Sequence, residues 1–135
     1  MIKMINNFLI IKYIGNNDKL GLRINKEFFI YDFGKQKKNN EQLVLVIMKF
    51  LKSHNAKLDK NFSIIVNQGP GSFSGLRISL AVAKGLKISR NTRLFGYKDK
   101  DLKEFDQENI ENLLKKNLIE KKLIQNKLIK PIYLS

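Results

Sequence analysis

The residues best suited to chemistry lie in one glycine-rich stretch, Gly69-Pro70-Gly71-Ser72-Phe73-Ser74-Gly75-Leu76-Arg77. Serines flanked by glycines are typical of a nucleophile elbow, which needs a histidine nearby to act as the base. The chain has a single histidine, His54, and nothing in the sequence places it to serve Ser72 or Ser74. We therefore expect no serine nucleophile and no catalytic residue in this chain.

The same stretch could also bind an anion, because backbone N–H groups at a helix N-terminus attract negative charge. The residues for such an anion site are Gly69, Gly71, Ser72, Ser74, Gly75 and Arg77. The stretch is not a P-loop, since no Gly-Lys-Ser/Thr follows at the required spacing. A structural role is the alternative, in which the turn fixes the following helix against a sheet. We prefer this interpretation and expect no cofactor.

Composition limits the other kinds of site. The chain has no cysteine and one histidine, which excludes disulfides, cysteine-ligated zinc and the usual multi-histidine metal sites. The longest apolar run, Leu43 to Met48, is six residues and is too short to span a membrane. No cleavage site follows the apolar residues near the N-terminus. We expect no metal, no membrane contact and a cytoplasmic protein.

The net charge of +14 admits two explanations. A basic surface attracts phosphates, which favours an RNA partner. Lysine, asparagine and isoleucine also share adenine- and thymine-rich codons, so a biased genome would give this composition without any function. The charge alone therefore leaves RNA binding open.

Hydrophobic periodicity predicts the elements that surround the turn. Three closely spaced strands come first, and their spacing indicates an antiparallel meander. A helix capped by Asn39 or Asn40, a buried strand, a helix capped by Ser72 or Ser74, and a short strand follow. The predicted ranges are 7–14, 20–24, 28–33, 40–53, 62–66, 73–88 and 93–97. This β-β-β-α-β-α-β order predicts a mixed α/β sheet flanked by helices, which is the ribonuclease H-like plan.

The chain is expected to form one lobe over residues 1–97, with the remaining residues packed on it. Residues 98–101 are a charged linker, and leucine and isoleucine at helical spacing predict a helix over 109–127. Pro131 ends any helix, so the last residues should be extended.

Two helices, over 40–53 and 73–88, carry apolar residues around most of their circumference. A helix of this kind must be covered on all sides, and one sheet covers only one side. A second protein is therefore expected to supply the missing cover.

The glycine-rich motif, continuing through Ile78-Ser79-Leu80-Ala81 to Ala83-Lys84-Gly85-Leu86, resembles the signature of a bacterial family. That family is the accessory subunit of threonylcarbamoyladenosine biosynthesis, the TsaB or YeaZ family. The ending Lys130-Pro131-Ile132-Tyr133-Leu134-Ser135 is similar to the family's Pro-x-Tyr-Leu-Arg, with Ser135 in place of arginine. The resemblance implies an actin-like fold of two lobes, of which this chain would be a shortened form with most of the second lobe missing.

The resemblance further implies a non-catalytic scaffold that pairs with a catalytic paralogue. The paralogue places a threonylcarbamoyl group on tRNA adenosine next to the anticodon, and a nucleotide-binding ATPase completes the complex. Pairing in the family uses the helices that correspond to 40–53 and 73–88 here, and the same helices could form a homodimer. The predicted interface consists of Leu43, Val46, Ile47, Phe50, Gly75, Ser79, Val82, Ala83 and Leu86.

Gly75, Ser79 and Ala83 lie four residues apart and would let a partner helix approach closely; alternatively they fit the helix to its own sheet. On the first interpretation, Val46→Glu or Val82→Glu should block pairing.

One departure from the wider superfamily bears on activity. Actin-like folds carry an aspartate at the end of the first strand, where this chain has Lys12-Tyr13. A lysine cannot coordinate a cation, so magnesium-dependent ATP hydrolysis is not expected. Two other functions stay open: a small phosphate- or nucleotide-binding protein that uses the glycine-rich turn, and a basic RNA-binding module that acts alone.

Overall fold

The computed structural model describes residues 6–34, 42–120 and 124–125. Its elements follow the chain in the order β1 (Asn7–Lys12), β2 (Lys19–Ile24), β3 (Glu27–Asp32), α1 (Leu43–Ser53), β4 (Phe62–Asn67), α2 (Phe73–Arg90), β5 (Arg93–Tyr97), η1 (Asp99–Asp101), α3 (Gln107–Glu120) and β6 (Ile124–Gln125).

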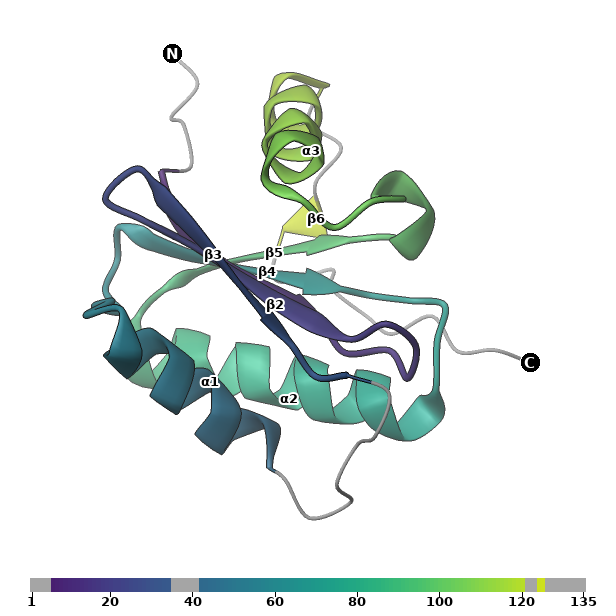
Figure 1. Cartoon of the computed structure of the whole chain (residues 1–135), viewed down its shortest axis with the longest axis horizontal. Helices are drawn as coiled ribbons and strands as arrows, with labels where there is room; N and C mark the ends of the chain where they lie inside the picture. Colours follow the sequence, from purple (N-terminus) through teal and green to yellow (C-terminus); the bar gives the residue numbers. More distant parts are fainter. Residues whose placement is uncertain (1–5, 35–41, 121–123, 126–135) are drawn as a thin grey trace.

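The strands form one mixed sheet in the order β3-β2-β1-β4-β5-β6. The first three strands are antiparallel neighbours, whereas β1, β4 and β5 run parallel to one another. β6 closes the described sheet as a short antiparallel partner of β5. Helices α1 and α2 cover one face of this sheet, and α3 lies on the other face (Figure 1). The predicted ribonuclease H-like plan is confirmed.

Each face of the sheet has its own hydrophobic core. Successive strand residues point to opposite faces, so β1 sends Leu9 and Ile11 toward α1 and α2 and sends Phe8 and Ile10 toward α3. β4 is buried along its whole length, as expected of a central strand between two helical layers.

Two predicted boundaries are corrected. α1 begins at Leu43 with Gln42 as its N-cap residue, so capping by Asn39 or Asn40 is wrong. The predicted helix over 109–127 is wrong at its C-terminal end, because α3 ends at Glu120 and residues 124–125 pair with β5. Backbone pairing to a strand distant in sequence decides that end, and helical periodicity cannot detect it. The predicted extended ending after Pro131 lies outside the described residues.

Among the described residues, no helix combines the length and the apolar character needed to span a membrane.

Candidate functional site

The glycine-rich turn packs tightly against the end of β1. Gly71 lies so close to Ile14 that a Cβ atom there would sit 2.5 Å from the Ile14 Cβ atom and 2.7 Å from its carbonyl oxygen. The Ser72 N–H donates to that same carbonyl at 2.7 Å. Gly69 has a φ of +96°, a conformation that glycine adopts without steric cost. The turn therefore joins β4 to α2 and presses the start of α2 onto β1.

The predicted Ser72 cap is confirmed. The Ser72 side-chain oxygen accepts from the Gly75 N–H at 3.2 Å, which satisfies one of the free donors at the start of α2. Ser74 is exposed. Arg77 lies over the Phe73 ring, with the guanidinium carbon 5.1 Å from the ring centroid.

Several N–H groups of the predicted anion site already have protein partners. The Gly69 N–H donates to the Asn67 side-chain oxygen at 2.7 Å, and the Ser72 and Gly75 N–H groups are engaged as described above. This arrangement fits the structural role that the sequence favoured for the turn.

Polar groups at the ends of the parallel strands form hydrogen bonds with neighbouring groups. The Ile14 and Gly15 N–H groups donate to the Asp18 carboxylate after β1. The Asn67 amide donates to the Asp99 carboxylate at 3.0 Å, and burial raises the pKa of the nearby Tyr97 phenol, which therefore stays neutral. Among the described residues no group of three or more histidines or carboxylates could hold a metal ion.

His54, the single histidine of the sequence, is partly enclosed by aromatic rings. It is the C-cap residue of α1. Its ring stacks on Phe29 with centroids 3.7 Å apart and meets Phe50 edge-on at 5.3 Å. The structure gives His54 a packing role at the edge of the α1 core.

The structure places the predicted interface residues in the chain's own core. Eight of the nine are buried beneath α1 and α2, and the ninth, Val82, is half-buried. The eight buried residues therefore do not lie on the exposed side of either helix. Both sides carry apolar or small residues, and spacing does not say which side meets the sheet. The buried eight are Leu43, Val46, Ile47, Phe50, Gly75, Ser79, Ala83 and Leu86.

A different set of residues faces outward on α2. Ser74, Ile78, Ala81, Gly85 and Ile88 are all exposed and follow one another at spacings of four, three, four and three residues. This spacing aligns them on one side of a helix. We call these five residues the outer stripe of α2. It contains no charged residue, and Ile78 and Ile88 are 44% and 83% exposed.

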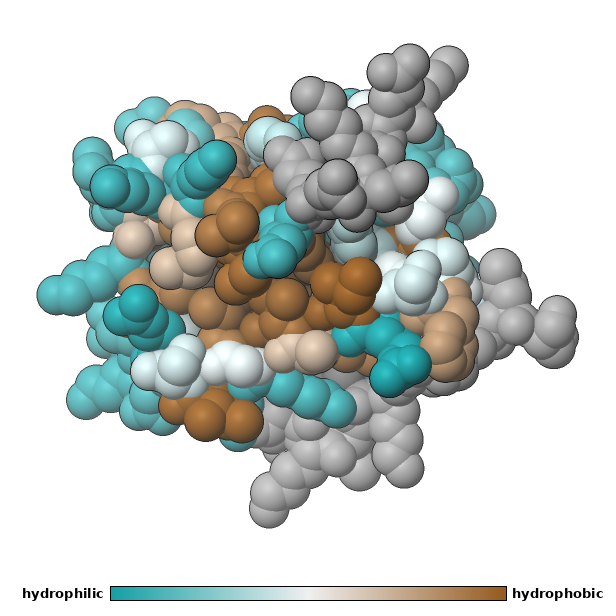
Figure 2. All heavy atoms as spheres, turned by 90° about the horizontal axis from the view of Figure 1, so that it is seen from below, coloured by the Kyte–Doolittle hydropathy of each residue, from teal (hydrophilic) through white to brown (hydrophobic). Residues whose placement is uncertain are grey.

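The outer stripe belongs to a larger apolar surface. Val44 and Leu45 of α1 and Phe73 at the start of α2 are also exposed. Figure 2 looks onto the two helices from below and shows hydrophobic residues gathered across the middle of this face, with hydrophilic residues around them. The described structure therefore leaves apolar side chains of both helices exposed, which is typical of interaction surfaces.

The charges on the two helices are all of one sign. α1 and α2 carry Lys49, Lys52, Arg77, Lys84, Lys87 and Arg90, and neither helix contains an aspartate or a glutamate. The charged residues on the two helices that carry the apolar surface are therefore all basic.

Val46→Glu is expected to unfold the chain rather than to block pairing selectively. Val46 is 6% exposed in the core beneath α1, where an unpaired carboxylate would lose its hydration. We expect a loss of at least about 3 kcal/mol in the free energy of unfolding. Urea denaturation followed by circular dichroism measures it, and a variant as stable as the parent chain would contradict the burial of this side chain.

Gly85→Ala is expected to stabilise the chain by about 0.5–1 kcal/mol, because alanine is a better helix former than glycine. A Cβ atom at Gly85 would meet no atom of the described residues within 4 Å. Gly75→Ala is the matched control in the same helix, since its Cβ atom would lie 2.9 Å from the Tyr13 carbonyl oxygen and should destabilise the chain. Denaturation midpoints of both variants test the prediction, and equal shifts in one direction would refute it.

Comparisons with known proteins find similarity to proteins of tRNA threonylcarbamoylation. The family model described as TsaD, tRNA N6-adenosine threonylcarbamoyltransferase, matches residues 35–98. A curated relative, the tRNA threonylcarbamoyladenosine biosynthesis protein TsaB of Buchnera aphidicola subsp. Baizongia pistaciae (strain Bp), is 41% identical over 63 residues. That match covers 45% of this chain and 28% of the relative.

Two solved structures share the fold. YeaZ from Pseudomonas aeruginosa superposes with a TM-score of 0.63 at 17% identity, over 72% of this chain and 46% of that chain. An uncharacterized protein with similarity to peptidase YEAZ, also from Pseudomonas aeruginosa, gives a TM-score of 0.62 at 17% identity, over 72% and 45% of the two chains. The chain thus spans just over a quarter of the curated relative and just under half of each solved structure.

Proposed function

From the premise that this chain is TsaB/YeaZ-like in the segment that these relatives match, we propose that it is a non-catalytic scaffold subunit in tRNA threonylcarbamoyladenosine biosynthesis. It pairs with a catalytic paralogue of the TsaD type, and an ATPase joins the complex. The observation that supports this function most directly is the uncovered apolar surface on α1 and α2. A subunit whose role is to hold a partner needs such a surface and does not need a catalytic residue.

The outer stripe of α2 suits a helix–helix contact. Ala81 and Gly85 lie in its middle, and small side chains there allow the backbone of a second helix to come close. Ile78 and Ile88 flank them and supply apolar area that association would remove from water.

The basic residues around the apolar surface favour a different protein, rather than a second copy of this chain, as the binding partner. A homodimer through α1 and α2 would bring together two surfaces that carry six basic residues each and no acidic residue. Like charges at an interface are unfavourable, whereas an acidic surround on the partner would be complementary. The partner should therefore present small or apolar residues with carboxylates around them.

Purification of the full chain with the catalytic paralogue from the same organism tests this function. We expect light scattering to give the mass of a one-to-one complex, and we expect added salt to weaken the complex because opposite charges surround the contact. Salt should strengthen a homodimer instead. Failure of two folded proteins to associate at low salt would refute the proposal.

A measurement on tRNA separates pairing from function. A reconstituted mixture of the paralogue, the ATPase, tRNA and a threonylcarbamoyl donor should modify tRNA only when this chain is present. Modification at the same rate without the chain would refute the scaffold role even if the complex forms.

A further inference from the structure

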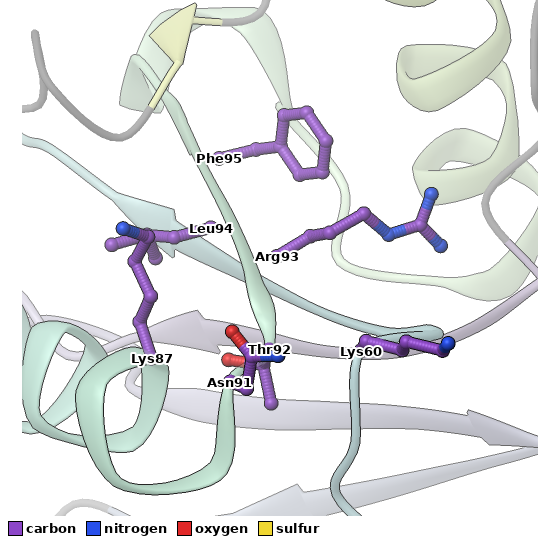
Figure 3. Close-up of a pocket in the computed structure, with 7 residues that line it drawn as sticks. All are labelled: Lys60, Lys87, Asn91, Thr92, Arg93, Leu94 and Phe95. Atoms are coloured by element: carbon purple, nitrogen blue, oxygen red, sulfur yellow. The ribbon is translucent and has the colours of Figure 1, made fainter.

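The β5 side of the sheet is protected against pairing with a strand of another molecule. β6 pairs with Phe95 and Gly96 of β5. Beside the first residues of β5, Figure 3 shows Lys87 on one side of the strand and Arg93 with Lys60 on the other. Proteins commonly place lysines at a strand edge to prevent such pairing. The cationic side chains around β5 therefore make this edge unsuitable for a second copy of this basic chain.

The opposite outer strand, β3, has none of these protections. Its six residues contain no lysine, no arginine and no proline. They pair one for one with the six residues of β2, so no bulge bends the strand away from a neighbour. Within the described part of the chain, no strand pairs with the other side of β3. A regular strand with an open edge is therefore available for pairing.

A hydrogen bond beside β3 shows which of its backbone groups point away from β2. The Phe33 N–H donates to the Asp18 carbonyl oxygen at 3.1 Å. Hydrogen-bonded residues alternate along an antiparallel pair, so the odd-numbered residues of β3 also bond to β2. The N–H and C=O groups of Phe28, Ile30 and Asp32 therefore point outward, and no described strand pairs with them.

Ile30, the middle one of these three residues, is also the most exposed apolar side chain of β3. It is 46% exposed. The other large apolar side chains that the described structure leaves exposed lie on α1 and α2. The centre of the β3 edge thus offers both free backbone groups and apolar area to an added strand, which are the two requirements of recognition by strand addition.

A second copy of β3 is complementary to this edge in one antiparallel register. With Ile30 of the two copies opposite each other at a two-fold axis, Phe28 of each copy faces Asp32 of the other. All outward N–H and C=O groups of these three residues then have partners. Phe29 of each copy faces Tyr31 of the other, which is a favourable aromatic pair across strands.

The charges of the strand agree with the same register. The two acidic residues of β3 are Glu27 and Asp32. In this register Glu27 faces Phe33 of the second copy and Asp32 faces Phe28, so neither carboxylate lies opposite a like charge. Like charges directly opposite each other would destabilise the pairing.

We propose that two copies of this chain pair antiparallel through β3, with Ile30 at the two-fold axis, and so form one continuous sheet. The contact depends on the chain alone and not on the function proposed above. It also leaves α2 free, because α2 packs on β4 and β5 at the other side of the sheet. A single strand pair is a small interface, so we expect a dissociation constant of about 0.1–1 mM.

Sedimentation equilibrium of the full chain tests the dimer. At a concentration of about 1 mM, we expect a weight-average mass of roughly 1.5–1.8 times the monomer mass. At about 10 μM the mass should be close to that of the monomer, so the complex with the paralogue can be measured without interference. A monomer mass at the higher concentration would overturn the proposal.

Ile30→Lys should abolish the dimer, because it places two lysines opposite each other at the two-fold axis. The side chain is exposed in the monomer, so the variant should keep the melting temperature of the parent chain. Ile78→Lys is the matched control, since Ile78 is 44% exposed and lies on α2. We expect this control to dimerise as the parent chain does. Loss of the dimer in the control, alone or together with Ile30→Lys, would overturn the assignment to β3.

A cysteine cross-link tests the register directly, because the natural sequence has no cysteine. Opposite residues of a hydrogen-bonded pair have Cα atoms about 5.5 Å apart, which suits a disulfide. Ile30→Cys should therefore cross-link two copies in a glutathione redox buffer. Asp32→Cys is the control, since the two copies of this residue would lie at least about 13 Å apart. Equal cross-linking of the two variants, or none with Ile30→Cys, would overturn the proposed pairing.

Discussion

Ala81→Glu is expected to abolish pairing with the catalytic paralogue and to leave the chain folded. Ala81 is exposed in the middle of the outer stripe, so the isolated chain can hydrate a carboxylate at this position. In the complex the same carboxylate would lie unpaired between two helices, at a cost of about 3–5 kcal/mol. The dissociation constant should therefore rise by about a hundredfold or more. Isothermal titration calorimetry of the purified proteins measures it.

The control for this variant is Lys103→Gln, which changes the net charge by the same amount. Lys103 is exposed, and it lies between η1 and α3, outside the two helices of the proposed interface. We expect this variant to pair as the parent chain does. If both variants lost affinity equally, long-range charge would explain the effect, and the outer stripe would not be the contact.

Among Gly→Ala substitutions in the glycine-rich turn, Gly71→Ala should cause the largest loss of stability. Its Cβ atom would lie 2.5 Å from the Ile14 Cβ atom and 2.7 Å from the Ile14 carbonyl oxygen, and the latter is backbone that cannot rotate away. Relief would require β1 and the turn to separate, which would also weaken the Ser72 N–H bond to the same carbonyl. We expect a loss of about 3 kcal/mol or more.

Chemical denaturation of Gly71→Ala beside Gly85→Ala measures this difference directly, since both add one methyl group. Destabilisation at Gly71 together with stabilisation at Gly85 is the expected pair of results. A folded Gly71→Ala chain of unchanged stability would show that the turn does not clamp α2 to β1.

Much of the fold could be predicted because the local signals agreed with tertiary structure. β5 follows the predicted range from Arg93 to Tyr97, and α2 begins at Phe73 after the Ser72 cap as predicted. Short apolar runs, turn residues and a capping serine all act over a few residues, so the sequence contains them in full.

The exposed side of α2 could not be predicted from the same signals. Gly75, Ser79 and Ala83 are spaced for close packing, and so are Ala81 and Gly85. The first three are buried within the chain, whereas Ala81 and Gly85 are exposed. Only the position of β1 and β4 beneath the helix decides between the two sets, and that position depends on contacts distant in sequence.

β6 was also beyond prediction. Residues 124–125 fall within a stretch of helical composition, and their strand pairing depends on the edge of β5, which is distant in sequence.

The alternating spacing of the outer stripe of α2 also sets the orientation of a bound partner. Steps of four and three residues average 3.5 residues, which is slightly fewer than the 3.6 residues in one turn of an α-helix. Helices that meet along such a repeat cross at about 20°, whereas the commonest contact between globular helices has a crossing angle of about 50°. The contacting helix of the catalytic paralogue would therefore run nearly parallel or antiparallel to α2. The active site of the paralogue would then have a fixed direction relative to the sheet of this chain.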